Sequence, residues 1–224
     1  MTATHSVVYE KAKRAARPVR NVSARERLVQ RIRVGKVYRR EDMVQWSNSI
    51  DHDLQQLVAE GRLKKPAQGL YYVPRKTDFG DEKPPVEEML AAFLKDKNFL
   101  FFNPSIYNSL RLGTTQLYNK TIVYNHKRHG KFKLGNREFD FRVKLRFPLR
   151  DKVTNEYLLV DMLNNLGELA EDDTMVLAAA RHKLMEFDVK KVQKTLQDYG
   201  SAATRRLMKK WLSELDATQV ESVK

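Results

Sequence analysis

Polar side chains that follow a short turn at residues 47–49 have the types and spacing needed to recognise a nucleic-acid base. A helix expected over about residues 50–60 has an apolar face made by Ile50, Leu54 and Leu57. Hydrogen-bonding side chains occupy the opposite face and the preceding turn: Asn48, Ser49, Asp51, His52, Gln55 and Gln56. Amide side chains can pair with adenine, and a carboxylate can accept from cytosine N4. This pattern predicts a helix that reads DNA bases.

Side chains suited to phosphate contact surround this helix in the sequence. They are Arg39, Arg40, Arg62, Lys64, Lys65, Gln68, Arg75 and Lys76. Such contacts would fix the register on DNA without reading its sequence. Asp51 and Asp53 suit the positive end of the helix dipole but repel phosphate. We therefore expect the helix to point into a groove if it binds DNA.

The elements that would position these side chains resemble a winged helix-turn-helix over residues 23–77. Ser23 and Glu26 form a capping-box pattern that begins a first helix. A second helix is expected over about residues 40–46, with Met43 and Val44 buried. Gly61 ends the third helix, and a short hairpin joins residues 63–65 to 70–73. In this fold the third helix enters the major groove; the alternatives are a protein-contact module or RNA binding.

The composition favours a polyanionic partner. The chain has 224 residues, with 42 Lys and Arg against 28 Asp and Glu, a net charge of +14 and a pI of about 9.9. Residues 1–80 carry 17 basic and 8 acidic side chains, whereas residues 151–224 carry 11 and 13. There is no cysteine, no apolar run long enough to span a membrane and no apolar signal-peptide core. We expect a cytoplasmic protein without a membrane partner.

The rest of the chain divides into segments of different character. Residues 1–22 are expected to form a flexible basic arm, either a solvated tail or an arm that lies on DNA. Residues 78–86 contain glycine, paired prolines and charges typical of a linker. Residues 87–224 are expected to form a larger mixed α/β domain with C-terminal helices, so that the whole protein is α+β. Expected helices there cover about residues 86–95, 155–166, 173–185, 188–199 and 201–215.

Strands are expected in the first half of this second domain. Residues 121–125 form one, and residues 131–134 and 137–147 form a hairpin that turns at Gly135 and Asn136. Apolar and charged residues alternate along 137–147, which predicts one buried and one solvated face. A secondary basic surface is expected from Lys127, Arg128, Lys131, Arg142, Lys144 and Arg146. It would suit phosphate or an acidic partner, or simply be a solvated sheet face.

No pattern indicates catalysis. There is no phosphate loop, no G-x-S-x-G and no H-E-x-x-H sequence. His126 and His129 are three residues apart, but no carboxylate cluster or cysteine accompanies them, so a basic loop is favoured over a metal site. We expect a binding protein, not an enzyme, with no cofactor and no metal.

The segments SNSIDHDLQQLVAEGRL, GLYYVP, KFKLGNREFDF and DVKKVQKTLQDYGSAATRRLMKKWL occur in this order. Over about residues 23–215, the chain resembles the AbiEi-type antitoxins of bacterial abortive-infection systems, the type IV toxin-antitoxin systems. The resemblance implies a transcriptional repressor that binds inverted repeats in its own operon and counteracts a nucleotidyltransferase-like toxin. It also implies that residues 48–56 form the reading helix and residues 62–72 the wing. The C-terminal domain would then serve antitoxin action.

Other functions fit the same residues. A stand-alone winged-helix transcriptional regulator has the same sequence pattern, and only the neighbouring reading frame would distinguish it. An RNA-binding or nucleic-acid-processing protein is a further alternative. Processing would need clustered carboxylates or a metal, and neither is visible in the sequence.

Overall fold

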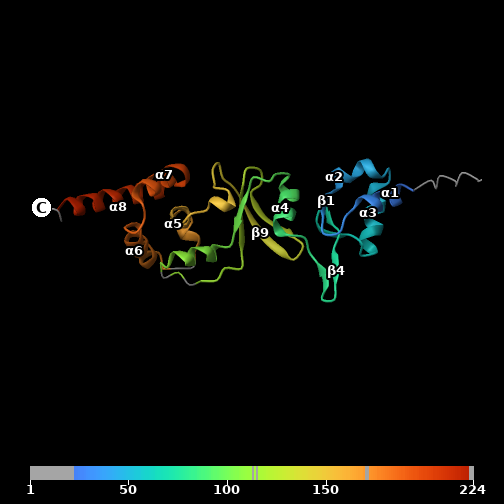
Figure 1. Ribbon diagram of the computed structural model, residues 1–224, viewed down its shortest axis with the longest axis horizontal. Helices are drawn as coiled ribbons and strands as arrows, with labels where there is room; N and C mark the ends of the chain where they lie inside the picture. The colour runs from blue at the N-terminus through green and yellow to red at the C-terminus, as the bar shows by residue number, and fades with distance from the viewer. Residues whose placement is uncertain (1–22, 113, 115, 170–171, 222–224) are drawn as a thin grey trace, which may run out of the picture.

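The computed structural model of the protein describes residues 23–112, 114, 116–169 and 172–221, with side chains described as far as residue 215. The basic arm expected over residues 1–22 lies outside the described residues. The described chain is an elongated α+β molecule with the N-terminal helices at one end and α8 (Ala202–Glu221) at the other (Figure 1). Within these residues, no helix is both long and apolar enough to cross a membrane.

The N-terminal part alternates short helices and strands. Its elements are α1 (Ala24–Arg31), β1 (Val37–Arg39), α2 (Arg40–Met43), the 3₁₀ helix η1 (Val44–Trp46), α3 (Ile50–Ala59), β2 (Lys64–Ala67) and β3 (Leu70–Tyr72). The strands form an antiparallel sheet in the order β1-β3-β2. The predicted capping box at Ser23 is confirmed, because Ser23 Oγ accepts from Glu26 N at 3.1 Å and Glu26 accepts from Ser23 N at 2.8 Å.

A small apolar core holds these helices together. Ile50, Leu54 and Leu57 are buried, as their helical spacing predicts, and they pack with Leu28, Met43, Leu63 and Tyr71. The expectation for Val44 was wrong, since its side chain is 46% exposed. The α-helix ends at Met43 and the chain tightens into η1. The tighter 3₁₀ winding turns the following side chain away from the face that Met43 buries.

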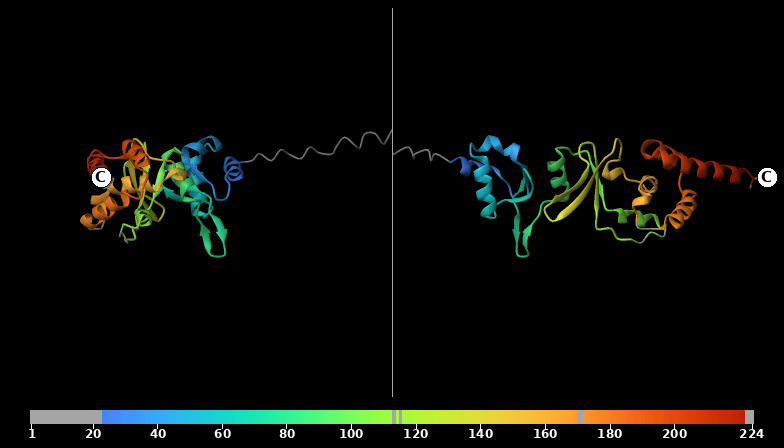
Figure 2. Two further views of the ribbon diagram at one scale, coloured as in Figure 1. Left: turned by 60° about the vertical axis from the view of Figure 1, so that its left-hand side comes forward. Right: turned by 180° about the vertical axis from the view of Figure 1, so that it is seen from behind.

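A hairpin occupies part of the segment in which a linker was expected. Strands β4 (Arg75–Thr77) and β5 (Gly80–Glu82) pair antiparallel, and Thr77 Oγ1 donates to Gly80 O at 2.8 Å. Gly80 has φ of +108°, a conformation open to glycine, and this closes the turn. The hairpin projects from the body of the molecule, as both views in Figure 2 show. Phe79 lies at its tip, and its side chain is fully exposed.

The second part is built around a four-stranded sheet in the order β6-β7-β9-β8. Its strands are β6 (Leu100–Phe102), β7 (Thr121–Asn125), β8 (Gly130–Leu134) and β9 (Arg137–Val143). The predicted hairpin turn at Gly135 and Asn136 is confirmed. The pairing of β7 with β9 is parallel, whereas the other pairings are antiparallel.

Helices cover both faces of this sheet. They are α4 (Val86–Leu94), α5 (Asn155–Asn164), α6 (Asp173–Leu184), α7 (Val189–Tyr199) and α8, with the 3₁₀ helices η2 (Pro104–Leu110), η3 (Arg150–Lys152) and η4 (Leu166–Glu168). Val123, Phe139 and Phe141 pack against α4. Ile122 and Tyr124 lie in the core that α5, α7 and α8 share. Alternate residues of one strand therefore serve two different cores.

The strand expected over residues 137–147 ends at Val143, four residues early. Val143 and Leu145, which the alternation placed on the buried face, are 52% and 85% exposed. Strand pairing explains the difference, because Asn125 of β7 is the last partner of β9 and lies opposite Val143. Beyond that residue no neighbouring strand holds the chain in the sheet, so the alternation no longer decides which side chains are buried.

The two parts of the chain share contacts. Leu70 of β3 packs in one cluster with Leu90 of α4 and Val123 of β7. Gly135 N donates to Pro66 O at 2.8 Å, which joins the β8–β9 turn to β2. Ion pairs add further links, Lys36–Glu88 at 3.0 Å and Lys95–Glu41 at 2.6 Å. The N-terminal sheet is thereby held against α4 and the second sheet.

Candidate nucleic-acid interface

The turn before α3 is organised by Ser47. Its hydroxyl donates to Asp53 at 2.5 Å and accepts from Ser49 N at 3.0 Å. Ser49 is the N-cap residue of α3, but its own side chain makes no capping bond. Asp53 is only 6% exposed, so its carboxylate faces the turn and not a DNA backbone. The phosphate repulsion expected from Asp53 is reduced for that reason.

Asp51 forms a two-pronged ion pair with Arg40. The guanidinium Nε and Nη2 donate to the two carboxylate oxygens at 2.5 and 2.6 Å. These hydrogen bonds lower the pKa of Asp51 and raise the pKa of Arg40. Both groups remain at the surface, but each has its charge compensated by the other. Arg40 as a phosphate contact, or Asp51 as a base contact, would have to give up this pairing.

The other predicted base-reading side chains are presented on the surface. Asn48, Ser49, His52 and Gln55 are exposed, and Gln56 is half-buried. His52 and Gln56 share a hydrogen bond of 2.9 Å along the helix. A shallow hollow of about 390 Å³ lies at the start of α3, between Arg40, Val44 and His52. The structure thus brings the predicted reading side chains together on one face of α3 and its leading turn.

The predicted phosphate contacts fall into two groups. Arg39 pairs with Glu41 at 3.0 Å and with Asp42 at 2.8 Å. Ion pairs also join Lys64 to Asp81 at 3.1 Å and Arg75 to Glu82 at 3.6 Å. Within the described part of the chain, three predicted cations form no ion pair, Arg62, Lys65 and Lys76, although Lys65 lies near enough to Asp51 to contribute to its lowered pKa. Lys65 lies over the ring of Tyr71, 6.0 Å from its centre.

Gln68 was expected to contact phosphate from a wing that extends into solvent, but the structure places it beside the second part of the molecule. It lies at the turn between β2 and β3, where the neighbouring Pro66 accepts the bond from Gly135. Its side chain is exposed, and it borders a hollow that β8 and α4 also line. The turn of this hairpin therefore lies beside the second part of the molecule.

The expected secondary basic surface is largely neutralised within the protein. Arg142 donates to Asp140 at 2.6 Å, to Asn165 at 3.1 Å and also to Glu168, and its side chain is 14% exposed. Burial alone would lower the pKa of Arg142, but its bonds to Asp140 and Glu168 raise it above the ordinary value. The face of β9 that carries Arg142 is covered by α5 and η4. The prediction of a solvated face at Arg142 was wrong for this reason.

Other members of the expected surface also have internal partners. Lys127 pairs with Asp96 at 3.3 Å, Lys131 with Glu138 at 3.9 Å and Arg146 with Asp198 at 3.7 Å. Arg128 stacks on the ring of Phe93. The His126 ring stacks on Phe147, with centres 4.8 Å apart. Among the described residues, no group of three or more His, Cys, Asp or Glu side chains is placed to hold a metal.

A buried polar network on α5 was not found from the sequence. Asp161 is 1% exposed, and it accepts from Tyr107 at 2.8 Å, from Tyr124 at 3.0 Å and from Lys144 at 2.9 Å. Burial and the nearby carboxylate raise the pKa of Tyr124. An acid within the apolar run YLLVDML is the pattern that could have indicated it. Lys144, expected at the surface, instead compensates this buried charge.

No protein-family model matches the chain, and no curated protein matches it significantly. Function is therefore inferred from the arrangement of these residues. Hydrogen-bonding side chains are gathered on α3 and its leading turn, and cations that form no ion pair lie on the elements that follow it. That arrangement can contact base edges and phosphates together.

Proposed function

We propose that this protein binds double-stranded DNA with α3 in the major groove. The observation that carries the proposal is the exposed polar face of α3, which presents His52 and Gln55, together with the exposed Asn48 in the turn that leads into the helix. Three of its buried residues anchor the opposite face in the core, so the polar face is held in a fixed orientation. A rigid helix with amide and imidazole groups at the surface matches what base reading requires.

The order of the N-terminal elements supports a winged helix-turn-helix. The order α1–β1–α2–α3–β2–β3, with the strands arranged β1-β3-β2, is the arrangement in which α3 would act as the recognition helix. Arg62 and Lys65 follow α3 directly and would reach the phosphates on either side of the groove. The Arg40–Asp51 pair removes much of the repulsion that an unpaired acid in the first turn would cause.

The physiological role proposed is that of an antitoxin that represses its own operon. This rests on the resemblance to AbiEi-type antitoxins and on the DNA-binding surface. The operator would be an inverted repeat, and the counteracted partner would be a nucleotidyltransferase-like toxin. Co-expression with the product of the adjacent reading frame tests that role. Restored growth supports it, and growth that stays inhibited while the promoter is still bound leaves a stand-alone regulator.

Fluorescence anisotropy on the protein's own upstream DNA tests the DNA-binding proposal directly. A scrambled duplex of equal length is the control, and both are titrated at two salt concentrations. We expect the upstream DNA to bind at least about a hundredfold more tightly at near-physiological salt, a modest preference for a specific DNA-binding protein. Equal and strongly salt-dependent binding to both duplexes would instead mean that the net charge of +14 gives a non-specific contact.

A further inference from the structure

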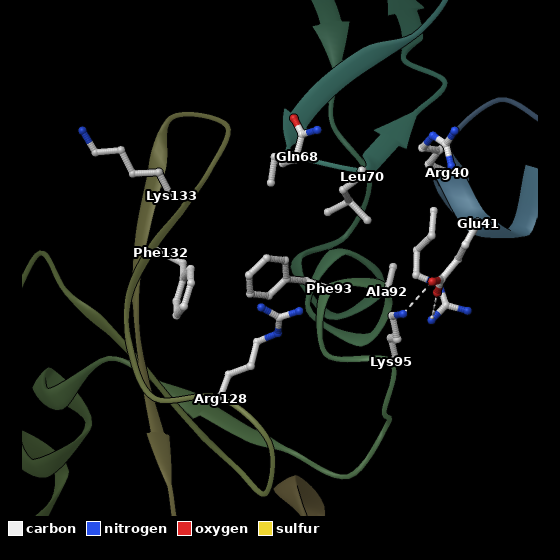
Figure 3. A pocket seen from close by; sticks show the side chains of 13 residues that line it. Arg40, Glu41, Gln68, Leu70, Ala92, Phe93, Lys95, Arg128, Phe132 and Lys133 are labelled. Atoms are coloured by element: carbon white, nitrogen blue, oxygen red, sulfur yellow. Dashed lines mark hydrogen bonds and ion pairs between the residues drawn. The ribbon is translucent and has the colours of Figure 1, made fainter. Parts of the chain in front are cut away.

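A hollow of about 600 Å³ lies between the N-terminal sheet and the second part of the molecule (Figure 3). We call it the Phe93 pocket, and its principal lining residues are Gln68, Leu70, Phe93, Arg128, Phe132 and Lys133. They come from the β2–β3 hairpin, from α4, from the turn after β7 and from β8. Its volume lies within the range of about 300–1,000 Å³ that small-molecule sites occupy.

Aromatic and aliphatic groups form one wall of the Phe93 pocket. The rings of Phe93 and Phe132 meet edge to face with centres 5.4 Å apart. Leu70 and Ala92 extend this apolar surface toward α2, as Figure 3 shows. A flat ring of a ligand could pack on such a wall, because aromatic side chains favour offset or edge contacts with other rings.

Cations complete the pocket. The Arg128 guanidinium lies 4.5 Å from the centre of the Phe93 ring and extends beneath it in Figure 3. Among the described residues, neither Arg128 nor Lys133 forms an ion pair, and Glu138, which lies opposite Lys133 in the β8–β9 pairing, is paired with Lys131 at 3.9 Å. Glu41, the acid that lines the pocket, is already paired with Arg39 and Lys95. The pocket therefore keeps uncompensated positive charge next to an apolar wall.

We propose that the Phe93 pocket binds a free nucleotide. A nucleobase would pack on the wall made by Phe93 and Phe132, and the amide of Gln68 would bond a polar edge of the base. The phosphates would be held by Arg128, while Lys133, whose side chain Figure 3 shows directed away from Phe132, stands at the outer rim. A stacked guanidinium is well suited to this, since it can keep its ring contact while its N–H groups bond phosphate oxygens. Neither a purely apolar ligand nor inorganic phosphate alone would use both halves of the pocket.

Isothermal titration calorimetry of the full-length protein tests this proposal without DNA, so its outcome is independent of the proposed function. The probes are ATP and GTP, with adenosine and inorganic triphosphate as the two separate halves of the ligand. We expect saturable binding of ATP or GTP at one site per chain. Each half should bind at least about tenfold more weakly, because it loses either the ring contact or the charged hydrogen bonds. Triphosphate binding as tight as that of ATP would overturn the proposal.

Variants locate the site. Arg128→Gln should lower nucleotide affinity about tenfold, and Lys133→Gln, at the exposed rim, about threefold. Arg206→Gln removes an exposed arginine on α8 outside the pocket and should leave affinity unchanged. Thermal unfolding of each variant checks that Arg128→Gln still folds, and Lys133→Gln provides the test if it does not.

Three further results would contradict the proposal. The first is that neither ATP nor GTP binds. The second is that both pocket variants bind as the unmodified protein does. The third is that octathymidylate binds in an Arg128-dependent manner while free nucleotides do not, which would assign the pocket to a nucleotide within a single strand.

Discussion

Two cations that follow α3 and two cations at the end of β9 look alike in the sequence but have opposite surroundings in the fold. Arg62 and Lys65 stand at the surface, and among the described residues neither forms an ion pair. Arg142 and Lys144 are instead compensated within the fold, Arg142 by Asp140 of β9 and Glu168 of η4, and Lys144 by Asp161 of α5. A basic residue offers its charge to an external polyanion only if the fold has not already paired it. The two regions therefore carry similar numbers of basic side chains but differ in how many of them are left unpaired by the fold.

Lys144→Ala is the variant expected to have the largest effect, and it tests the internally paired side of this comparison. It leaves the Asp161 carboxylate buried without its cation, and removing one partner of a buried pair is strongly destabilising. We expect a loss of about 3 kcal/mol in the free energy of unfolding. Urea denaturation measures this change.

The control for this variant is Lys133→Ala, at an exposed lysine of β8, which should change stability by less than about 0.5 kcal/mol. The double variant Lys144→Ala with Asp161→Asn should recover part of the loss, because it also removes the buried charge. If Lys144→Ala is as stable as the control, the pair of Lys144 with Asp161 does not stabilise the fold. The contrast between internally paired cations and those available to DNA would then not hold.

Local patterns allowed much of the fold to be predicted. Helix spacing placed Ile50, Leu54 and Leu57 in the core, and the turn at Gly135 was placed correctly. Predicted helices of the second part agree closely with α4 to α7, and the last one was predicted to begin within one residue of α8 but to end six residues before Glu221. Capping residues and apolar periodicity allowed this because they are local properties of the chain. Pairing between strands that are distant in the sequence left no local pattern from which it could be predicted. Neither the parallel contact of β7 with β9 nor the strand β1 was predicted.

The candidate site was predicted less completely, for the same reason. Side-chain types on α3 were sufficient to expect a reading face, since one helix carries all of them. Ion pairs between elements could not be read from spacing: Arg40 with Asp51, and Lys64 with Asp81. The polarity of residues 142–146 indicated a solvated face because the sequence does not show that α5 covers it. Charge pairing is a tertiary property, and it decides which of the predicted contacts remain available.

Gln55→Ala tests whether the exposed face of α3 distinguishes one DNA sequence from another. Loss of one well-formed amide contact to a base should reduce the preference for upstream DNA over scrambled DNA about tenfold. Affinity for scrambled DNA should not change, because Gln55 carries no charge. Anisotropy titrations on both duplexes measure the ratio. Gln30→Ala, at an exposed glutamine of α1, is the matched control. Equal ratios for the two variants would show that α3 is not the reading helix.

Adjacent lysines give a sharper test of charge availability. Lys65 forms no ion pair among the described residues and interacts only at longer range with Asp51, whereas Lys64 pairs with Asp81 at 3.1 Å. Lys65→Ala should weaken binding to any duplex a few-fold and reduce the slope of log affinity against log salt by about 1. Lys64→Ala should change that slope by less. The measurement is a salt series on scrambled DNA, and a larger effect of Lys64→Ala would contradict the role given to pairing.

Asp51→Asn should have the smallest effect on DNA binding, and it should strengthen binding where the preceding variants weaken it. Arg40 lowers the pKa of Asp51, so the ion pair is complete at neutral pH and is lost only as the pH falls through that lowered pKa. Substitution is therefore the means of opening the pair under the conditions in which DNA binding is measured. It removes a negative charge from the first turn of α3 and leaves Arg40 free for phosphate.

We expect Asp51→Asn to raise affinity for scrambled DNA about two- to threefold and to steepen its salt dependence, because one more cation is available to the backbone. Asp198→Asn opens the pair with Arg146, far from α3 in the second part of the chain, and serves as the control that should leave both quantities unchanged. If the two variants raise affinity equally, total charge governs binding and not the charge that the fold leaves free at α3. A gain confined to Asp51→Asn would place the DNA backbone next to Arg40.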